Sequence, residues 1–321
     1  MRSMFKIFSL PVLLLFAAAA AGQNYPVKPV RIVIGFPPGG PNDLIARAVA
    51  PRLTENMGQP FFIENKPGGN AVIGTSFVAK SQPDGYTLLV FSSSQTINPS
   101  TRKVIPFDTL KDFVGVSGLA VGQIVLAVNP GVAAQSLKDF VALAKSSPGK
   151  LNYGSTGTGS ATHLGMELFN LMAGIRTVHV PYQGAGPATQ DLLAGTVDAL
   201  FMGVSTAVPY ISAGKVRPLA MASLKRSSAL PDIPSFQEEG FQKFDISSAF
   251  GLLAPSATPR LVVNRLNDGV QKVLDIGDIK QAFTKLGLEP WQLKPSELQE
   301  WLAGEVERWQ HVARAINYQL E

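Results

Sequence analysis

Three glycine-rich turns are the segments of this sequence whose composition best suits ligand binding. They cover residues 36–43, 65–70 and 154–160, and the third is rich in serine and threonine and is followed by His163. Glycine lets a backbone come close to a ligand, and the free N–H groups at a helix N-terminus carry partial positive charge. One such turn would indicate no more than a loop between a strand and a helix. Three together favour a site for a small anion such as a carboxylate.

The turns do not match the motifs of nucleotide-binding sites or serine hydrolases. Gly159 is followed by Ser160 and Ala161, so the third turn lacks the P-loop lysine, and neither G-x-G-x-x-G after a strand nor G-x-S-x-G occurs. His163 and Glu167 stand four residues apart, a spacing that favours a pair on one helix face over half a metal site. We therefore expect no catalytic residue, no metal and no cofactor.

Composition narrows the class of protein further. The 321 residues contain no cysteine, which excludes disulfides, thiol nucleophiles and cysteine-ligated metals. Hydrophobic residues make up 45% and charged residues 16%, which is typical of a globular protein. The formal charge is +5, or 26 − 23 = +3 without Arg2 and Lys6, which is too weak a signal for a nucleic-acid partner.

The N-terminus has the three parts of a secretory signal. A short basic start to Lys6 precedes an apolar run over residues 7–21, and Ala19 and Ala21 offer a small-residue cleavage site. The apolar run contains Pro11 and falls short of the roughly 20 residues that span a membrane. We expect residues 1–21 to be removed and the mature chain to be exported.

The elements that position the turns alternate between strand and helix, which predicts an α/β fold with mostly parallel, doubly wound sheets. The helix after the first turn is expected to be capped by Asn42 or Asp43 and to kink or stop at Pro51. The last helix is expected to begin at Ser296 with a capping box to Gln299. Apolar runs predict strands at 30–36, 61–65, 86–91, 123–128, 151–154, 177–181, 199–202, 219–222 and 247–254.

Together these motifs resemble the Bug or TctC-like extracytoplasmic receptors of the tripartite tricarboxylate transporter system. The resemblance covers essentially the whole mature chain. It is carried by residues 36–43, 65–68, 83–88, 153–163, 180–184, 191–195, 214–217 and 230–234.

The resemblance implies a two-lobed periplasmic binding protein that closes about a hinge of two crossing segments, near residues 119–126 and 243–252. Lobe 1 would comprise residues 25–121 and 246–321, and lobe 2 residues 122–245. Such a receptor captures a small mono- or dicarboxylate between its lobes and hands it to a membrane permease without chemistry. A monomer in the periplasm is expected.

Site residues follow from the resemblance, position by position. The first lobe would contribute Phe36, Gly39, Gly40, Gly69 and Asn70, and the second lobe Ser155, Thr156, Gly157, Thr158, Ser160, His163, Gln183 and Gly184. Two departures from the family pattern affect the identity of the ligand. Asn70 and Ala71 replace glycines, so that Asn70 either contacts the ligand or caps the following helix, the cap being favoured. Ala249 and Phe250 stand where many relatives have tryptophan.

Two other functions remain open from the sequence. The chain could be a receptor that presents its ligand-bound state to a signalling partner, or an exported enzyme on the same fold. The lack of cysteine, of a hydrolase motif and of an acid–base pair disfavours the enzyme.

Overall fold

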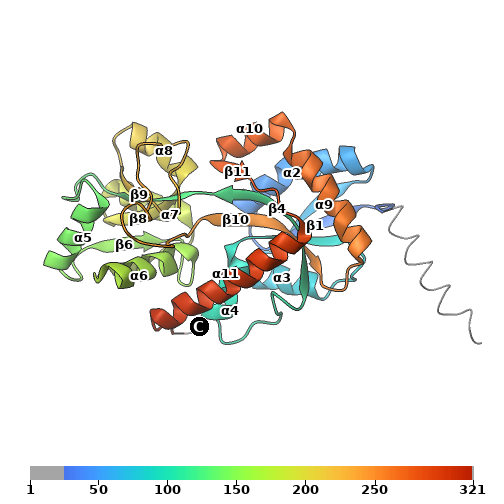
Figure 1. The fold of residues 1–321 in the computed structure, drawn as a ribbon, viewed down its shortest axis with the longest axis horizontal. Helices are drawn as coiled ribbons and strands as arrows, with labels where there is room; N and C mark the ends of the chain where they lie inside the picture. Colours follow the sequence, from blue (N-terminus) through green and yellow to red (C-terminus); the bar gives the residue numbers. More distant parts are fainter. Residues whose placement is uncertain (1–24, 320–321) are drawn as a thin grey trace, which may run out of the picture.

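The computed structural model describes residues 25–319, which form two lobes lying side by side (Figure 1). The predicted signal peptide, residues 1–21, lies outside the described residues. Each lobe has a sheet with helices on both faces, which confirms the α/β two-lobed fold. Within residues 25–319 no helix is long and apolar enough to cross a membrane.

The first lobe contains a six-stranded sheet in the order β11-β4-β10-β3-β1-β2. Its elements are β1 (Val30–Ile34), α2 (Pro41–Met57), β2 (Phe61–Asn65), α3 (Val72–Ala79), β3 (Thr87–Phe91), α4 (Ser93–Thr101), β4 (Phe113–Gly122), β10 (Ser248–Pro255), α9 (Arg260–Leu274), α10 (Gly277–Lys285) and β11 (Leu288–Pro290). Both faces of β1 are buried, because Ile32 and Ile34 pack toward α2 and α9 while Val33 packs toward α3. This double burial explains the unbroken apolar run of the strand.

The second lobe contains a five-stranded sheet in the order β7-β6-β8-β5-β9. Its elements are β5 (Ile124–Val128), α5 (Leu137–Ser146), β6 (Asn152–Ser155), α6 (Ala161–Ala173), β7 (Val178–Pro181), α7 (Ala185–Ala194), β8 (Ala199–Gly203), α8 (Val204–Ser212) and β9 (Arg217–Met221). Leu126 of β5 packs with α5 and α6, and Val125 packs with α7 and α8.

Both sheets are mixed, whereas the sequence predicts mostly parallel ones. In the first sheet β1 pairs parallel with β2 and β3, but β10 runs antiparallel to β3 and β4. In the second, β5 runs antiparallel to β8 and β9. β5 and β10 each run against the βαβ units of their own sheet, because β5 brings the chain into the second lobe and β10 brings it back into the first. β4, which is antiparallel to β10, keeps the direction of β3.

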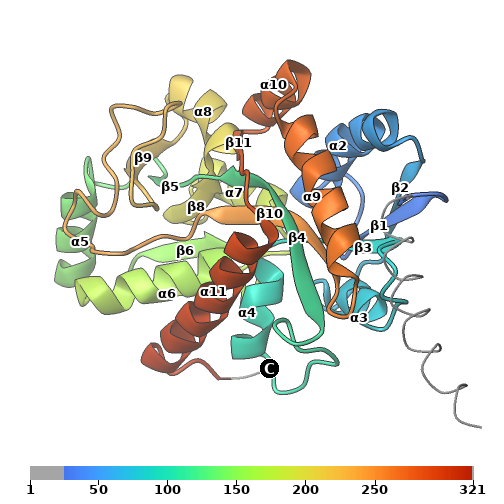
Figure 2. The same cartoon turned by 45° about the vertical axis from the view of Figure 1, so that its right-hand side comes forward.

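Two crossing segments and one helix link the lobes, and the sequence predicts the two crossing segments but not the helix. The chain passes from β4 to β5 at Gln123 and returns through β10. The third link is α11 (Pro295–Ala315), which runs from the first lobe toward the second beside α4 (Figure 2). Trp309 and Val312 near its end pack into the core of the second lobe, whereas Leu298 and Leu302 near its start pack into the first.

Two helices differ locally from their prediction. α2 runs through Pro51 to Met57, because Pro51 and Arg47, whose carbonyl loses its donor, both lie on the exposed face where water can replace that bond. α11 begins at Pro295 rather than Ser296. The carboxylate of Glu297 accepts from the backbone N–H of Lys294 at 2.7 Å. Gln299, instead of completing a capping box, accepts from Gly115 N–H at 2.9 Å.

Candidate functional site

A cavity of about 540 Å³ lies between the two lobes, at the carboxyl ends of strands from both sheets. Gly39 and Pro41 line it from the first lobe, and Thr156, Ala185 and Gly203 line it from the second. The starts of α2, α6, α7 and α8 therefore meet around one space. Convergent helix N-termini at the carboxyl edge of an α/β sheet are suited to binding an anion.

The first turn is held by one buried carboxylate. Asp43 is 2% exposed, and its Oδ2 accepts from Gly39 N–H at 3.0 Å and from Arg47 Nε at 2.7 Å. Its Oδ1 accepts from Asn65 Nδ2 at 3.0 Å, and the same amide group donates to Phe36 O at 3.1 Å. The hydrogen bond from Arg47 is the main cause that lowers the pKa of Asp43 to about 2, so the group stays ionised.

The prediction that Asn42 or Asp43 caps α2 is wrong. The N-cap is Gly40, and neither Asn42 nor Asp43 caps the helix from that position. Asn42 is 5% exposed, and its Nδ2 has no hydrogen-bond partner within residues 25–319. Leu44, in the first turn of α2, is 39% exposed and lines the cavity. Gly39 has a φ of 89°, and a Cβ there would meet nothing within 4 Å, so its backbone is open to a ligand.

The Asn70 side chain of the second turn forms hydrogen bonds with α4 and does not cap α3. Asn70 Nδ2 donates to Asn98 Oδ1 at 3.2 Å, and Ser94 Oγ donates to Asn70 Oδ1 at 3.0 Å. The N-cap of α3 is Ala71, so the favoured capping role of Asn70 is wrong. Gly69, Asn70 and Ala71 all have positive φ, of 59°, 54° and 70°, which explains why glycine suits this turn. Both Gly69 and Asn70 lie outside the residues that line the cavity.

The hydroxyl groups of the third turn bond mainly to one another. Thr156 N–H donates to Thr162 Oγ1 at 3.0 Å, and the hydroxyls of Thr156 and Ser160 each lie 3.1 Å from that same atom. Ser160 is the N-cap of α6 and accepts from His163 N–H at 3.3 Å. Of this network, Thr156 and Thr162 line the cavity.

Ser155 is turned into the protein. It is fully buried, and its Oγ lies 2.7 Å from Nε2 of His179 and accepts from Gly157 N–H at 3.1 Å. The ring of His179 stacks on that of His163 with centroids 3.9 Å apart, and His163 Nδ1 accepts from Gly159 N–H at 3.1 Å. Burial lowers the pKa of both histidines to about 4, so each is neutral at pH 7. These side chains shape the turn from behind.

The remaining predicted residues belong to the second lobe and lie outside the cavity lining. Thr158 and Gln183 are exposed, and Gly184 is the N-cap of α7 with a φ of 108°. A Cβ on Gly184 would meet nothing within 4 Å. Of the thirteen predicted residues, Gly39 and Thr156 line the cavity, and the other eleven lie outside its lining.

The sequence analysis did not identify the start of α8 or the end of α10 as parts of the cavity wall. Ser205 and Thr206, in the first turn of α8, line the cavity, and so does Lys285 at the end of α10. The signal for α8 was present in the sequence: an apolar strand followed by Gly203 and two hydroxyl residues, as at the third turn. The apolar part of the wall includes Leu200, Phe201, Met202, Phe250 and Leu288.

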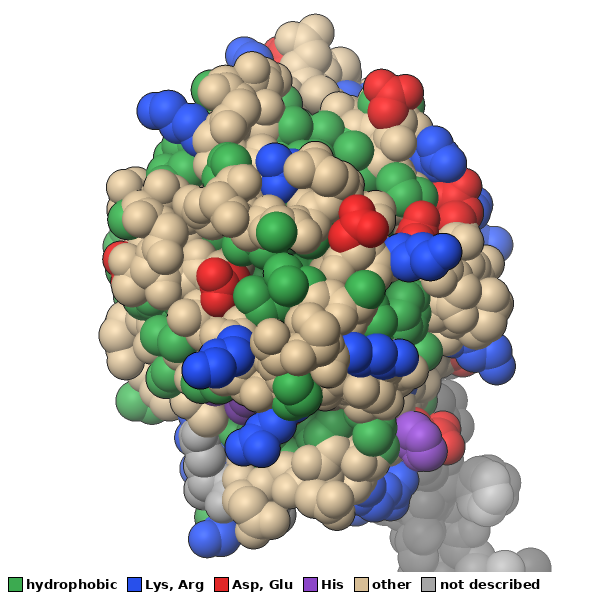
Figure 3. Space-filling view, turned by 90° about the vertical axis from the view of Figure 1, so that its left-hand side faces the viewer, with side chains coloured by type: hydrophobic (Ala, Val, Ile, Leu, Met, Phe, Trp, Pro, Cys, Tyr) green, Lys and Arg blue, Asp and Glu red, His purple; other side chains and the backbone are tan. Residues whose placement is uncertain are grey.

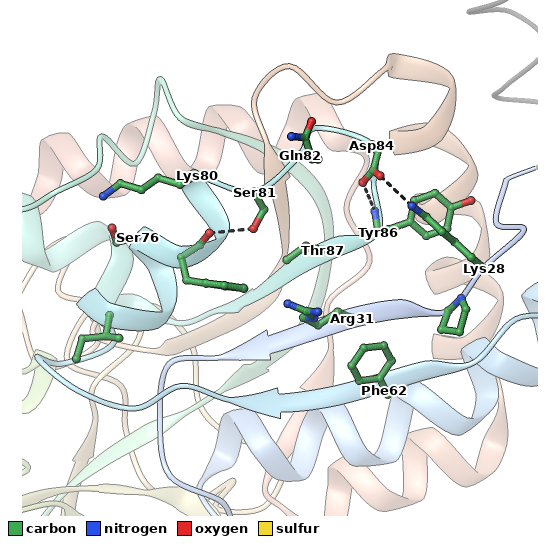
Figure 4. A pocket seen from close by; sticks show the side chains of 13 residues that line it. Lys28, Arg31, Phe62, Ser76, Lys80, Ser81, Gln82, Asp84, Tyr86 and Thr87 are labelled. Carbon is green, nitrogen blue, oxygen red and sulfur yellow. Dashed lines mark hydrogen bonds and ion pairs between the residues drawn. The ribbon is translucent and has the colours of Figure 1, made fainter.

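A second, more open groove of about 800 Å³ lies on the first lobe away from the cleft (Figure 4). Arg31 and Phe62 stand side by side in the sheet there, and Lys28 pairs with Asp84 at 3.3 Å. Arg31 Nε lies 3.2 Å from a Glu64 oxygen without an aligned hydrogen bond. The groove lies toward the amino ends of β1, β2 and β3, opposite the edge where ligands bind in such sheets. We therefore place the site in the interlobe cavity.

Charged side chains on the outside of the second lobe are mixed in sign. On the face drawn in Figure 3, lysine and arginine side chains are interspersed with acidic and hydrophobic ones. This distribution differs from the continuous basic surface of nucleic-acid-binding proteins. Within residues 25–319 no group of three or more histidine, aspartate or glutamate side chains is placed to hold a metal ion.

Known proteins resemble this chain in both sequence and fold. BugT of Bordetella pertussis (strain Tohama I) is 35% identical over 307 residues, 95% of this chain and 94% of its own. A Rhodopseudomonas palustris structure, MatC with bound malate, has a TM-score of 0.78 at 31% identity and covers 90% of this chain and 99% of its own. An R. palustris structure with adipate has a TM-score of 0.82 at 32% identity and covers 92% of this chain and 100% of its own. The model of the tripartite tricarboxylate transporter family receptor, TctC, matches residues 45–318. The chain therefore belongs to this family of solute-binding receptors, as its motifs indicate, and is a binding protein rather than an enzyme.

Proposed function

We propose that the protein captures a small carboxylate between its lobes in the periplasm and delivers it to a membrane permease. The observation that carries the proposal is the interlobe cavity, around which four helices begin. Its lining includes one cation and no acidic side chain among the described residues. An anion that enters this space meets hydrogen-bond donors from both lobes and no negatively charged side chain in the lining.

The family supports a carboxylate as the class of ligand. Two relatives of about 30% identity were solved with adipate and with malate, both carboxylates. The turn backbones at Gly39 and Gly184 leave open space where a Cβ would stand, so a small acid can come close to the backbone of both turns. Thr156, Ser205 and Thr206 add hydroxyl donors to the wall.

Binding is proposed to draw the lobes together about Gln123 and the start of β10, with lobe 1 formed by residues 25–121 and 246–321 and lobe 2 by residues 122–245. A ligand that touches both lobes favours the closed state by its differential affinity. Because α11 packs on both cores, it must bend or slide as the lobes close. Small-angle scattering should show a smaller radius of gyration at saturation; an unchanged radius would mean a rigid cleft.

Thermal melts of the mature protein with a panel of carboxylates test the binding. A ligand at 100 times its dissociation constant adds about 2.7 kcal/mol, which raises the melting temperature by about 5 °C for a chain of this size. A panel in which neutral sugars raise the melting temperature and no carboxylate does would contradict the proposal.

A variant that fills the interlobe cavity tests whether the rise in melting temperature comes from binding there. Gly203 has a φ of −59° and lines the cavity, and a Cβ there meets nothing within 4 Å, so Gly203→Leu should fill the cleft without strain and abolish the shift. Gly304→Leu is the control, because Gly304 is exposed on α11, its Cβ also meets nothing, and it lies outside the cavity lining. Delivery is tested in cells that lack this chain: uptake of the same acid should return with the native protein and not with Gly203→Leu.

A further inference from the structure

Lys285 is the one charged side chain among the described residues that line the interlobe cavity. It lies at the C-terminal end of α10, is exposed, and makes no ion pair within residues 25–319. Lys280 on the same helix, in contrast, lies 3.4 Å from an Asp275 oxygen. The cavity thus contains a cation without a counter-ion.

The fold places this cation at the side of the cavity where α10 meets the second lobe. The turn between α10 and β11 packs so closely on the first turn of α8 that a Cβ on Gly287 would lie 2.3 Å from the Cβ of Ser205. Gly287 also has a φ of 63°, which suits glycine at this contact. Lys285 therefore lies two residues before Gly287, which contacts Ser205 of the other lobe.

Apolar side chains occupy much of the remaining wall. They come from β8, β10 and β11, with Leu44 of α2 on the first-lobe side. The wall thus offers two separate kinds of anion attraction, from helix N-termini and from Lys285, together with an apolar surface. A ligand that matches all three has two acidic groups joined by an apolar frame.

We propose that Lys285 recognises a second acidic group of the ligand, so that the site selects diacids over monoacids of the same carbon frame. This inference rests on the proposed function and names its ligand class. The side chain is exposed in the described state, where an ion pair is weak, and a ligand enclosed between the lobes strengthens it by excluding water. A preference of about tenfold, equal to about 1.4 kcal/mol, is expected.

The other role open to Lys285 is purely structural. A lysine in the last turn of a helix interacts favourably with the helix dipole. That role would affect the stability of α10 and would leave the ratio of diacid to monoacid affinity unchanged. The ratio is therefore the measurement that separates the two roles.

The experiment uses calorimetry on the mature protein with matched acids: succinate and butyrate, adipate and hexanoate, terephthalate and benzoate. In the native protein at least one diacid should bind about tenfold more tightly than its partner. Lys285→Met keeps the apolar stem and should reduce that ratio to about one, whereas Lys285→Arg should retain it. Lys280→Met is the matched control on the same helix and should leave the ratio unchanged.

Two results would overturn the inference while leaving the proposed function intact. One is equal binding of monoacids and diacids in every pair, and the other is a diacid preference that survives Lys285→Met. Failure of all six acids to bind would refute both the carboxylate site and the inference built on it.

Discussion

Replacing Asp43 by asparagine tests whether a single buried carboxylate holds the first turn of the binding site. The carboxylate accepts three hydrogen bonds, two at Oδ2 from Gly39 and Arg47 and one at Oδ1 from Asn65. Asparagine offers one acceptor oxygen and one donor nitrogen. In either orientation, Asp43→Asn therefore sets an N–H group against another donor.

The magnitude follows from the ionisation of Asp43. Its pKa falls from an ordinary 3.8 to about 2 in the folded protein, mainly through the hydrogen bond from Arg47. At about 1.4 kcal/mol per pKa unit, this shift contributes about 2.5 kcal/mol to the free energy of unfolding at pH 7. Because the folded pKa is the lower one, the contribution is present above about pH 4 and is lost as the pH falls toward 2. About half should remain at pH 3.

Urea unfolding of the ligand-free protein at pH 7, 5, 4 and 3 measures the effect. Asp43→Asn should reduce the free energy of unfolding by about 3 kcal/mol at pH 7, and the gap to the native protein should narrow steadily below pH 4. Asp278→Asn is the control, because that carboxylate is 72% exposed and pairs with Arg52 at the surface, where less than about 1 kcal/mol is expected. A gap that is absent at pH 7, or that does not change with pH, would show that the ionised Asp43 carboxylate does not stabilise the fold.

Three further substitutions test the supports of the turns by urea unfolding at pH 7. Gly35→Ala should destabilise by about 1–3 kcal/mol, because the new Cβ would lie 2.5 Å from that of Ala71; a neutral result would mean the second turn can move away. Ser155→Ala should cost about 1–3 kcal/mol, since the hydroxyl is buried against His179; weakened carboxylate binding with unchanged stability would instead assign Ser155 to the ligand. Ser160→Ala should cost about 1 kcal/mol through loss of the cap of α6, and unchanged stability would contradict that cap.

Local chemistry could be predicted from the sequence where it depends on neighbouring residues. The strands with apolar runs, such as 87–91 and 199–202, are found because burial on both faces leaves a continuous signal. The starts of α2 and α6 follow their glycine-rich turns, and Ser160 caps α6. The family could be predicted because its motifs are specific in combination.

What depends on distant contacts could not be predicted. α4 is rich in serine, threonine and asparagine and contains Pro99, which is poor helix composition. Its position is fixed by contacts such as the hydrogen bond from Gln95 to Thr75 and the packing of α11 alongside. Although Ser92 and Gln95 form a capping box that the sequence contains, the apolar period that would have drawn attention to it is missing.

In the candidate site, too, local features could be predicted and features that depend on distant contacts could not. The sequence indicates which turns surround the cavity, but the direction of each side chain depends on partners far along the chain. Ser155 turns inward because His179 lies behind it, 24 residues later. Lys285 lines the cavity because the α10–β11 turn packs against Ser205, a contact between lobes that no local pattern encodes.

The most direct test of the account is a crystal structure of the mature protein with the carboxylate that raises its melting temperature most. We expect the acid to lie in the interlobe cavity, with one carboxylate at the helix N-termini near Gly39, Thr156 and Ser205. A carboxylate ordered instead in the open groove beside Arg31 and Phe62, with the interlobe cavity filled by water, would contradict it.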